Sequence, residues 1–570
     1  MPRIPVSVTA GGRLDYSYHA NNLLKDVVSS NSGGVNVGYR YDELNRLESV
    51  DDTSTGLPTR TTGYTYNPNG SRETVTTPNG VSHTYGYDAL NRLRGLVVAR
   101  GTTLLHTYEY KLRPTGHRRE VVENSAKSTT YTYDELYRLT GETVAGVADP
   151  GQNGAIAYIL DKVGNRLARN SQLSALSSQL NQSYNSRDWL AGDTYTANGS
   201  TVQGGTGVSP VGSFTDAYDF EERLIVRTKS DGSTINVSYD ADGHRIAKNL
   251  LSPIAAPVSS TYWLVDTNNL TGYCQVLEER IAAGSTTTLK AYLYGTSLLS
   301  QAVSTNGSAT TLSYYASDGH GNIRELTSST GTITDRYDYD AFGNLTFQNG
   351  TTPNAYRYAG EQYDPDLGLY YLRARYLNPD SGRFWSQDTY DGILDDPASL
   401  HKYLYAHANP VAFNDPSGNA VSIGQLMGVA ASKILDRMAT INSVRYFRRV
   451  AGGLCKAAKT MLMPFNQFYN HVSKVSPFQR HHVFRNESMV ALFETYTRPL
   501  GMAIALLGGS AHSGSPHDKA TKYQNKVAKY NWPPEKVAYG ALLAAGCSVS
   551  DAREIVQNVK NYNEIKKWIP

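Results

Sequence analysis

A tyrosine-rich unit recurs at a fixed spacing through the first part of the chain. The stretch from Tyr39 to Leu47, YRYDELNRL, returns from Tyr85 and again from Tyr131, 46 residues further on each time. Shorter Tyr-x-Tyr or Tyr-Asp copies stand at 64–67, 108–110, 218–219, 239–240 and 337–340. A copy therefore comes about every 20–25 residues, which is the length of one β-hairpin. Such self-similarity predicts an architecture of repeated hairpins.

The composition of each repeat assigns it a structural role. Tyrosines two residues apart share one face of a strand, and the following Asp-x-x-x-Arg suits a turn in which the arginine pairs with the aspartate. Threonine and valine between the copies favour strands, and Asn-Gly or Asp-Gly pairs favour tight turns. One hairpin cannot bury its own apolar face, so the hairpins must stack. Residues 1–355 are predicted to form about fifteen stacked strand pairs.

A dense junction follows the repeats. Residues 356–388 read YRYAGEQYDPDLGLYYLRARYLNPDSGRFWSQD, and residues 403–419 read YLYAHANPVAFNDPSGN. Its aromatic side chains require burial, and its prolines fix turns. The segment closely resembles the core that ends the β-shell of Rhs and other YD-repeat toxins. That resemblance implies a multidomain, β-rich fold in which 1–355 spiral into a hollow cocoon and 356–419 close one end. We expect fewer strands than in a complete Rhs shell, an N-terminal end left open, and a chain that is part of a longer protein.

The charge distribution separates the C-terminal region from the rest. Residues 420–570 hold 20 Lys and Arg against 8 Asp and Glu, a net charge of +12, whereas 1–419 hold 34 against 43, a net charge of −9. Of 42 tyrosines, 35 precede residue 420. Such different compositions predict separate bodies, of which the basic one favours a polyanionic partner. Three scattered cysteines predict no disulfide framework, and the sequence predicts no membrane span and no secretory signal.

The resemblance to Rhs proteins also implies self-cleavage. Their core cuts the chain just after an Asp-Pro-x-Gly-Leu motif with paired aspartates, one acting as base towards water and the other as acid towards the leaving amide. Asp415 matches the motif, and the cut would fall between Asn419 and Ala420. Asn419 stands where that family usually has leucine. Asp388 is the candidate second carboxylate, and its rivals are Asp391, Asp395 and Asp396. The structural alternative is that Asp415 only caps a turn.

The region from residue 420 to residue 570 is predicted to be a small, mainly α-helical domain of α+β type. Apolar residues recur with a period of 3.6 after Val421, and further helices are predicted around 445–463, 486–507, 516–530, 534–546 and 549–567. Pairs of glycines or prolines punctuate these segments, at 452–453, 508–509 and 533–534.

Four of the chain's thirteen histidines lie within 37 residues of this region. Neutral imidazoles brought together from two elements are a common cage for a divalent ion. The pair His481-His482, followed by His512 and His517, resembles the HNH or ββα-metal nucleases of polymorphic toxins. That resemblance implies that His481, His512 and His517 hold one divalent metal ion (Mg or Zn) and that His482 is the general base. It also places Arg480, Arg485 and Lys519 at the substrate phosphate. The central asparagine of those nucleases is missing between Thr497 and Ser510.

Three functions remain open from the sequence. The favoured one is a toxin whose shell carries a metal-dependent nuclease, a hydrolase acting on nucleic acid, with DNA preferred over RNA. The expected partners are a cognate immunity protein and a secretion machinery or delivery complex. The toxin would be secreted or delivered into target cells, with the shell retained with or near the secretion apparatus. The second is a surface or adhesion protein whose tail is an inert plug. The third is a metal-free ribonuclease that uses His482 and Lys519.

Overall fold

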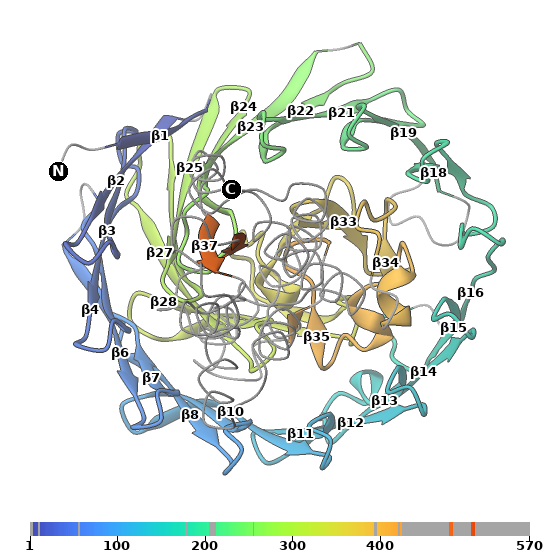
Figure 1. Ribbon diagram of the computed structural model, residues 1–570, viewed down its shortest axis with the longest axis horizontal. Coiled ribbons are helices and arrows are strands. Elements are labelled where there is room, and N and C mark those ends of the chain that lie inside the picture. Colours follow the sequence, from blue (N-terminus) through green and yellow to red (C-terminus); the bar gives the residue numbers. More distant parts are fainter. Residues whose placement is uncertain are drawn as a thin grey trace, which may run out of the picture. The chain divides into compact units, whose positions relative to one another are not determined.

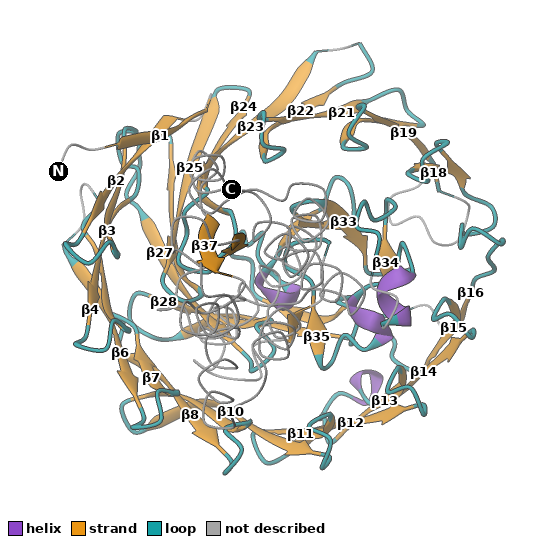
Figure 2. Ribbon diagram, in the orientation of Figure 1, coloured by secondary structure: helices purple, strands orange, loops and turns teal. Residues whose placement is uncertain are grey.

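The computed structural model describes residues 4–9, 12–54, 58–176, 179–204, 213–254, 256–392, 396–419, 422–423, 478–482 and 503–507. The chain divides into two compact units, Met1–Ala430 and Ala431–Pro570. Antiparallel strands dominate the described residues, whose helices are four short 3₁₀ turns (Figure 2). None of the described helices is long and apolar enough to cross a membrane.

The first unit is built from two large antiparallel sheets and several small ones. The 16-stranded sheet contains β1 (Ile4–Thr9), β2 (Gly12–Tyr18), β3 (Leu24–Ser29), β4 (Asn36–Tyr41), β5 (Leu47–Asp52), β6 (Arg60–Tyr66), β7 (Arg72–Thr76), β8 (Val81–Tyr87), β9 (Leu93–Arg100), β10 (Thr103–Leu112), β11 (Arg118–Glu123), β12 (Lys127–Tyr133), β13 (Leu139–Ala145), β14 (Gly154–Leu160), β15 (Arg166–Ser171) and β16 (Gln179–Asn181). A two-stranded sheet pairs β17 (Thr194–Tyr195) with β18 (Thr201–Gln203).

The 12-stranded sheet contains β19 (Phe214–Tyr218), β20 (Leu224–Lys229), β21 (Thr234–Tyr239), β22 (Arg245–Leu251), β23 (Pro257–Asp266), β24 (Gln275–Ala283), β25 (Thr286–Tyr294), β26 (Leu298–Thr305), β27 (Thr311–Ser317), β28 (Ile323–Ser328), β29 (Ile333–Tyr339) and β30 (Leu345–Asn349). In each sheet every strand pairs with its neighbour in the chain. The thirty strands described before Tyr356 confirm the prediction of about fifteen strand pairs.

The turn predicted from Asp-x-x-x-Arg is confirmed. Asp42 Oδ1 accepts hydrogen bonds from the main-chain amides of Leu44 and Arg46, each 2.9 Å long, and Asp42 Oδ2 lies 2.7 Å from Arg46 Nε. The same 2.7 Å Nε–Oδ2 contact closes the turns at Asp88/Arg92, Asp134/Arg138 and Asp219/Arg223. These aspartates and arginines therefore hold the hairpins together, as the sequence indicates.

The second large sheet packs onto the first. One hydrophobic core joins residues of β2–β7 to residues of β23–β29, and it includes Tyr16, Val37, Leu264 and Tyr292. Tyr16 Oη donates a 2.7 Å hydrogen bond to Asp266, 250 residues away in the sequence. Within this unit the strands follow one another around a curved wall, and β25, β27 and β28 lie along the inner side of the earlier strands (Figure 1). The wall therefore buries the apolar face of its first strands under its own later strands.

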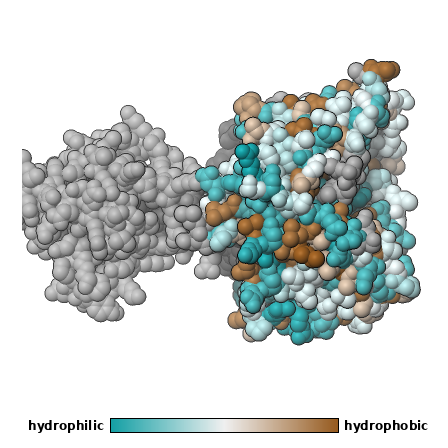
Figure 3. Space-filling model, turned by 90° about the vertical axis from the view of Figure 1, so that its right-hand side faces the viewer, coloured by the Kyte–Doolittle hydropathy of each residue, from teal (hydrophilic) through white to brown (hydrophobic). Residues whose placement is uncertain are grey.

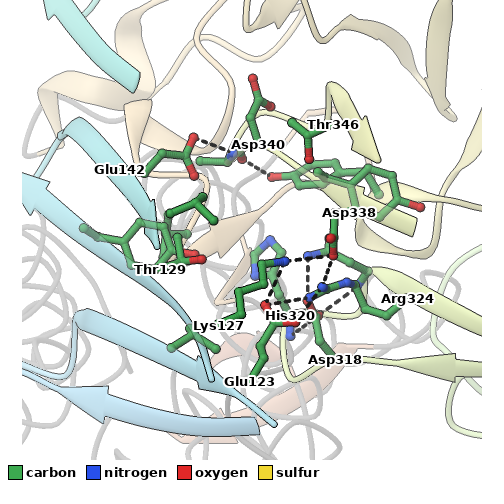
Figure 4. A pocket seen from close by; sticks show the side chains of 18 of the residues that line it. Glu123, Lys127, Thr129, Glu142, Asp318, His320, Arg324, Asp338, Asp340 and Thr346 are labelled. Carbon is green, nitrogen blue, oxygen red and sulfur yellow. Dashed lines mark hydrogen bonds and ion pairs between the residues drawn. The ribbon is translucent and has the colours of Figure 1, made fainter. Parts of the chain in front are cut away.

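A buried ion-pair network joins the two sheets further along the wall (Figure 4). Arg324, on β28, lies 2.8 Å from Glu123 on β11, and it also contacts Asp338. Lys127 at the start of β12 lies 3.0 Å from Asp338 and 3.4 Å from Glu123. Although burial alone would raise the pKa of Glu123, the positive charges of Arg324 and Lys127 hold it well below its usual range.

Replacing Arg324 with methionine is expected to destabilise the first unit by about 3–5 kcal/mol, because buried carboxylates then lose their main cation. Arg336→Met is the matched control. The Arg336 side chain is 55% exposed and lies 3.4 Å from Glu325, so its loss should cost about 1 kcal/mol or less. Denaturant unfolding followed by tyrosine and tryptophan fluorescence measures both changes. Equal midpoints for Arg324→Met and Arg336→Met would contradict the importance of the network.

A compact core follows the wall. Its sheet contains β31 (Gln362–Asp364), β32 (Leu369–Leu372), β33 (Arg375–Asn378) and β34 (Arg383–Phe384), and β35 (Phe413–Asn414) pairs with β36 (Ser422–Ile423). The 3₁₀ turns are Pro150–Gln152, Tyr358–Gly360, Pro397–Leu400 and Ala406–Ala408.

Buried polar contacts tie this core to the wall. Arg227 on β20 forms 2.7 Å hydrogen bonds with both carboxylate oxygens of Asp216 and donates a third to the Leu367 carbonyl. Trp385 Nε1 also donates to Asp216, over 2.9 Å. The Trp385 ring also packs against the Phe214 ring, so an apolar contact accompanies these hydrogen bonds. The face shown in Figure 3 mixes hydrophilic and apolar side chains, as is normal for a protein surface.

In the second unit, the structure describes two paired strands, β37 (Phe478–His482) and β38 (Ala503–Leu507). The prediction of a helix over 486–507 is wrong for its last five residues, which form β38. The run Ala-Ile-Ala-Leu-Leu is apolar throughout, and a short apolar run fits a buried strand as well as a helix. The helical pattern predicted after Val421 is wrong for Ser422–Ile423, which form β36, and its remaining residues and the other predicted helices lie outside the described residues.

Candidate active site

The candidate site is organised by the turn between β32 and β33. This turn presents Arg373 and Arg375 towards the Asp-Pro-Ser-Gly segment at 415–418. The amide of Ala374 lies 3.3 Å from the Ser417 carbonyl. Gly418 has a φ of +73°, and a Cβ at this position would lie 2.2 Å from the Leu372 carbonyl oxygen. Only glycine fits so close an approach, so the motif is held tightly against the turn.

Arg375 joins both predicted carboxylates. Its Nη2 lies 2.8 Å from Asp388 Oδ2 and 3.7 Å from Asp415 Oδ2. The three side chains are 5%, 12% and 3% exposed, so the cluster is nearly removed from water. The same guanidinium donates from Nε to the Gly418 carbonyl and from Nη1 to the Lys402 carbonyl, over 3.0 Å in the second case. Arg375 thus holds the carboxylates and the main chain of the motif together.

The electrostatics of this cluster follow from its burial. Burial raises the pKa of Asp388, against the opposing effect of Arg375, and the negative charge of Asp415 adds to the rise. Burial likewise lowers the pKa of Arg375, although both carboxylates oppose this change. A carboxyl with a raised pKa keeps its proton at a higher pH than an ordinary aspartate does. Asp388 is therefore suited to donate a proton.

The rivals of Asp388 are not brought to Asp415 in the same way. Asp391 is exposed, and Asp396 lies 3.8 Å from His407 with 37% of its side chain exposed. Asp395 lies outside the described residues. Of the candidates that the structure describes, Asp388 is the one that shares Arg375 with Asp415.

The residues around the predicted cut form the loop of a small hairpin. Because β35 pairs with β36, the chain reverses between Asn414 and Ser422. Ser417 Oγ donates to Asp415 Oδ1 over 2.9 Å and accepts a 3.2 Å hydrogen bond from the Asn419 amide. Asn419 is half-buried, and Ala420 lies outside the described residues. The Asp415 side chain thus supports its own loop, as the structural alternative requires, and also reaches Arg375.

Sequence reasoning missed the two arginines of the turn as site residues. Arg373 donates to the Pro416 carbonyl and lies 3.0 Å from both Glu361 carboxylate oxygens. The available signal was the Arg-Ala-Arg stretch in a short hairpin turn, where buried guanidinium groups need acceptors. That signal does not say which acceptors they find, because Asp388 and Pro416 follow later in the chain.

The predicted nuclease residues are described only in part. Arg480, His481 and His482 lie on β37, where they pair with Ala505, Ile504 and Ala503 of β38. The remaining predicted residues, His512, His517, Arg485 and Lys519, lie outside the described residues. In the part of the chain that the structure describes, no group of three or more His, Cys, Asp or Glu residues is arranged to hold a metal ion.

Parts of this chain are similar in sequence to known proteins. It is 32% identical over 286 residues to the tRNA3(Ser)-specific nuclease WapA of Bacillus spizizenii, and the match covers 48% of this chain and 11% of that protein. The match to the tRNA nuclease WapA of Bacillus subtilis has the same identity and the same coverage. The chain thus spans about a tenth of the length of the curated relatives it matches. No protein-family model matches it.

A solved structure shares the fold of the first unit. The crystal structure of TcdB2-TccC3-Cdc42 matches with a TM-score of 0.60 at 19% identity, over 72% of this chain and 22% of that chain. Together with the repeats, the antiparallel wall and the core, these matches show what kind of structure the first unit is. It carries a YD/RHS-repeat β-shell that is related in sequence to the WapA proteins and shares its fold with TccC3.

Proposed function

We propose that this protein is a polymorphic toxin whose core cuts its own chain between Asn419 and Ala420 and releases a C-terminal nuclease from the β-shell. The observation that carries the proposal is the buried cluster in which Arg375 contacts Asp388, Asp415 and the Gly418 carbonyl. A plug without chemistry needs no second carboxylate beside the motif. Burying charges costs free energy, so the arrangement points to a role beyond capping a turn.

In the proposed cleavage, the two aspartates have different tasks. Asp415 takes a proton from the attacking water, and Asp388 gives a proton to the leaving amide nitrogen of Ala420. The raised pKa of Asp388 suits it to the acid role. Arg375 holds the Gly418 carbonyl and so fixes the chain just before the cut.

The released part is proposed to cleave phosphodiester bonds. His482 takes the proton from the attacking water, and Arg480, Arg485 and Lys519 bind the phosphate. The paired strands β37 and β38 around the His pair are in keeping with a ββα-metal fold. The net charge of +12 over 420–570 supplies sequence-independent attraction to nucleic acid. The two WapA relatives are named tRNA nucleases, which makes tRNA the first substrate to test beside DNA.

One divalent metal ion is the proposed cofactor of the released part. His481, His512 and His517 would supply three imidazole nitrogens, a donor set that suits a borderline divalent ion such as zinc and leaves a position open. When bound, the ion would polarise the phosphate and stabilise the leaving oxygen. A producing cell would then need a small, acidic immunity protein to complement the basic cargo, and delivery would need a secretion machinery.

The test is expression of residues 420–570 alone and of the whole chain in bacteria. The isolated tail is expected to stop growth and to degrade tRNA or DNA, and the whole chain to be much less toxic because the shell sequesters the cargo. A chelator should abolish degradation by the purified tail. Degradation that persists in chelator would support the metal-free ribonuclease, and equal growth with the tail and an empty vector would support the inert plug.

A further inference from the structure

A cysteine, a histidine and an aspartate meet where the turn between β21 and β22 lies beside the start of β24. Cys274 Sγ lies 2.9 Å from His244 Nε2, and His244 Nδ1 lies 3.0 Å from Asp240 Oδ2. A nucleophile within hydrogen-bond reach of a base, which a third group orients, is the usual geometry of an activated thiol. Neither the self-cleavage nor the nuclease uses these residues.

In the other repeat turns that begin with aspartate and close in the same way, the residue four places further on is arginine or asparagine, whereas here it is histidine. Asp240 closes its turn as the other repeat aspartates do, with Oδ1 accepting from the His244 amide over 2.8 Å. In three other turns the residue four places after the aspartate is Asn, whose side chain bonds the same Oδ2: Asn165 to Asp161, Asn322 to Asp318 and Asn344 to Asp340. The turn itself therefore does not require an imidazole. What histidine adds is a second nitrogen, and this nitrogen contacts Cys274.

The surroundings of the pair favour a protonated imidazole beside the cysteine. The hydrogen bond with Cys274 raises the pKa of His244 to about 9, burial opposes the rise, and Asp240 adds to it. From the core, the Arg373 guanidinium donates a 2.8 Å hydrogen bond to the Cys274 carbonyl and adds positive charge on that side. Glu361 balances part of this charge, 3.0 Å from Arg373. Reactive cysteines occupy such electropositive, partly exposed places.

Small molecules in solution can reach the pair. Cys274 is half-buried, and 19% of the His244 side chain and 26% of the Asp240 side chain are exposed. The structure offers no second cysteine here, since Cys274 is the one cysteine among the described residues. We therefore consider a thiol-reactive molecule from solution as the reaction partner of Cys274.

We propose that Cys274 is an activated thiol that undergoes thiol–disulfide exchange with a small disulfide, assisted by His244 and oriented by Asp240. The Cys274 thiolate attacks one sulfur of the disulfide, a new S–S bond forms, and the old S–S bond breaks. The departing sulfur leaves with the bonding electrons and takes a proton from His244 Nε2. Cys274 is thereby oxidised to a mixed disulfide, and half of the small disulfide is released as a thiol. The modification would lie close to the cleavage motif, because the Arg373 side chain contacts both the Cys274 carbonyl and the Pro416 carbonyl.

The experiment is incubation of the whole chain with oxidised glutathione, followed by peptide mapping of each cysteine by mass spectrometry. At pH 6.5 only about 1% of an ordinary thiol is ionised, since its pKa is near 8.5. A lower thiol pKa increases the ionised fraction but weakens the nucleophilicity of each thiolate. The mixed disulfide at Cys274 is expected to form roughly tenfold faster in the parent than in His244→Asn at this pH. Between pH 6.5 and pH 8 the rate should rise more steeply in His244→Asn than in the parent, because asparagine offers no imidazolium to the departing sulfur.

His244→Asn is the matched variant because asparagine occupies this turn position in three other repeats, so the fold should survive. Circular dichroism and the melting temperature check that it does. Asp240→Asn leaves the imidazole without its carboxylate and should give an intermediate rate, and Cys274→Ser should carry no modification at that peptide. Equal rates of modification at Cys274 in the parent and in His244→Asn at pH 6.5 would overturn the proposal. It would also be overturned if the rate in the folded parent rose with pH as steeply as the rate in the denatured chain.

Discussion

Asp415→Asn is expected to leave a single 570-residue product where the parent chain yields fragments of 419 and 151 residues. An amide can neither take a proton from water nor carry the charge that Arg375 now balances. General acid–base groups contribute typically about 10²–10⁴-fold to a rate, so cleavage should disappear from ordinary incubation times. Denaturing gel electrophoresis and intact-mass measurement follow the products. Asp388→Asn should slow cleavage comparably, because it removes the proposed acid.

Asp396→Asn is the control for this experiment. Asp396 stands near Asp388 in the sequence but faces His407, 3.8 Å away, so its replacement should leave cleavage as in the parent. The pH dependence supplies a second check. Because Asp388 must be protonated to act, the cleavage rate should fall as the pH rises through its pKa, which burial has raised. A parent chain that stays whole after prolonged incubation would show that Asn419 has abolished cleavage and that the core is only a plug.

Local features of the chain could be predicted because their causes are local. The Asp42–Arg46 turn rests on residues four places apart, and the sharing of one face by alternate tyrosines follows from strand geometry. The sequence also singles out Asp388, by its place after the Gly-Arg-Phe segment, and its role as the second carboxylate stays a prediction. The structure brings Asp388 to Asp415 through Arg375.

Long-range features could not be predicted from such patterns. The bond from Tyr16 to Asp266 spans 250 residues, and no repeat says which hairpins will face each other across the wall. His244 was similarly hidden: a histidine in a repeat turn is unremarkable until the loop before β24 brings Cys274 beside it. The strand at Ala503–Leu507 was missed because its apolar run lacks the alternation that distinguishes a strand, and its partner β37 lies about twenty residues earlier.

His482→Ala and His512→Ala are expected to disable the nuclease in different ways. If His481, His512 and His517 hold one ion while His482 is the base, His512→Ala removes a ligand. Metal affinity then falls, and excess metal should restore part of the cutting. His482→Ala leaves the ligands in place but removes the proton acceptor, so activity should fall by about 10²–10⁴-fold whatever the metal concentration. Nuclease assays across a metal series, with calorimetric metal titration of each whole-chain variant, measure the two effects separately.

The contrast between these two variants is what makes the assignment testable. Either substitution alone could reduce activity by disturbing the fold, but a folding defect would not reduce metal affinity in one variant and spare it in the other. His471→Ala is the matched control, since it changes a histidine of the same region that has no proposed role, and both activity and metal binding should stay at the parent level. Metal binding lost in His482→Ala but kept in His512→Ala would reverse the two roles. Activity that survives both substitutions would place the catalytic chemistry elsewhere in residues 420–570.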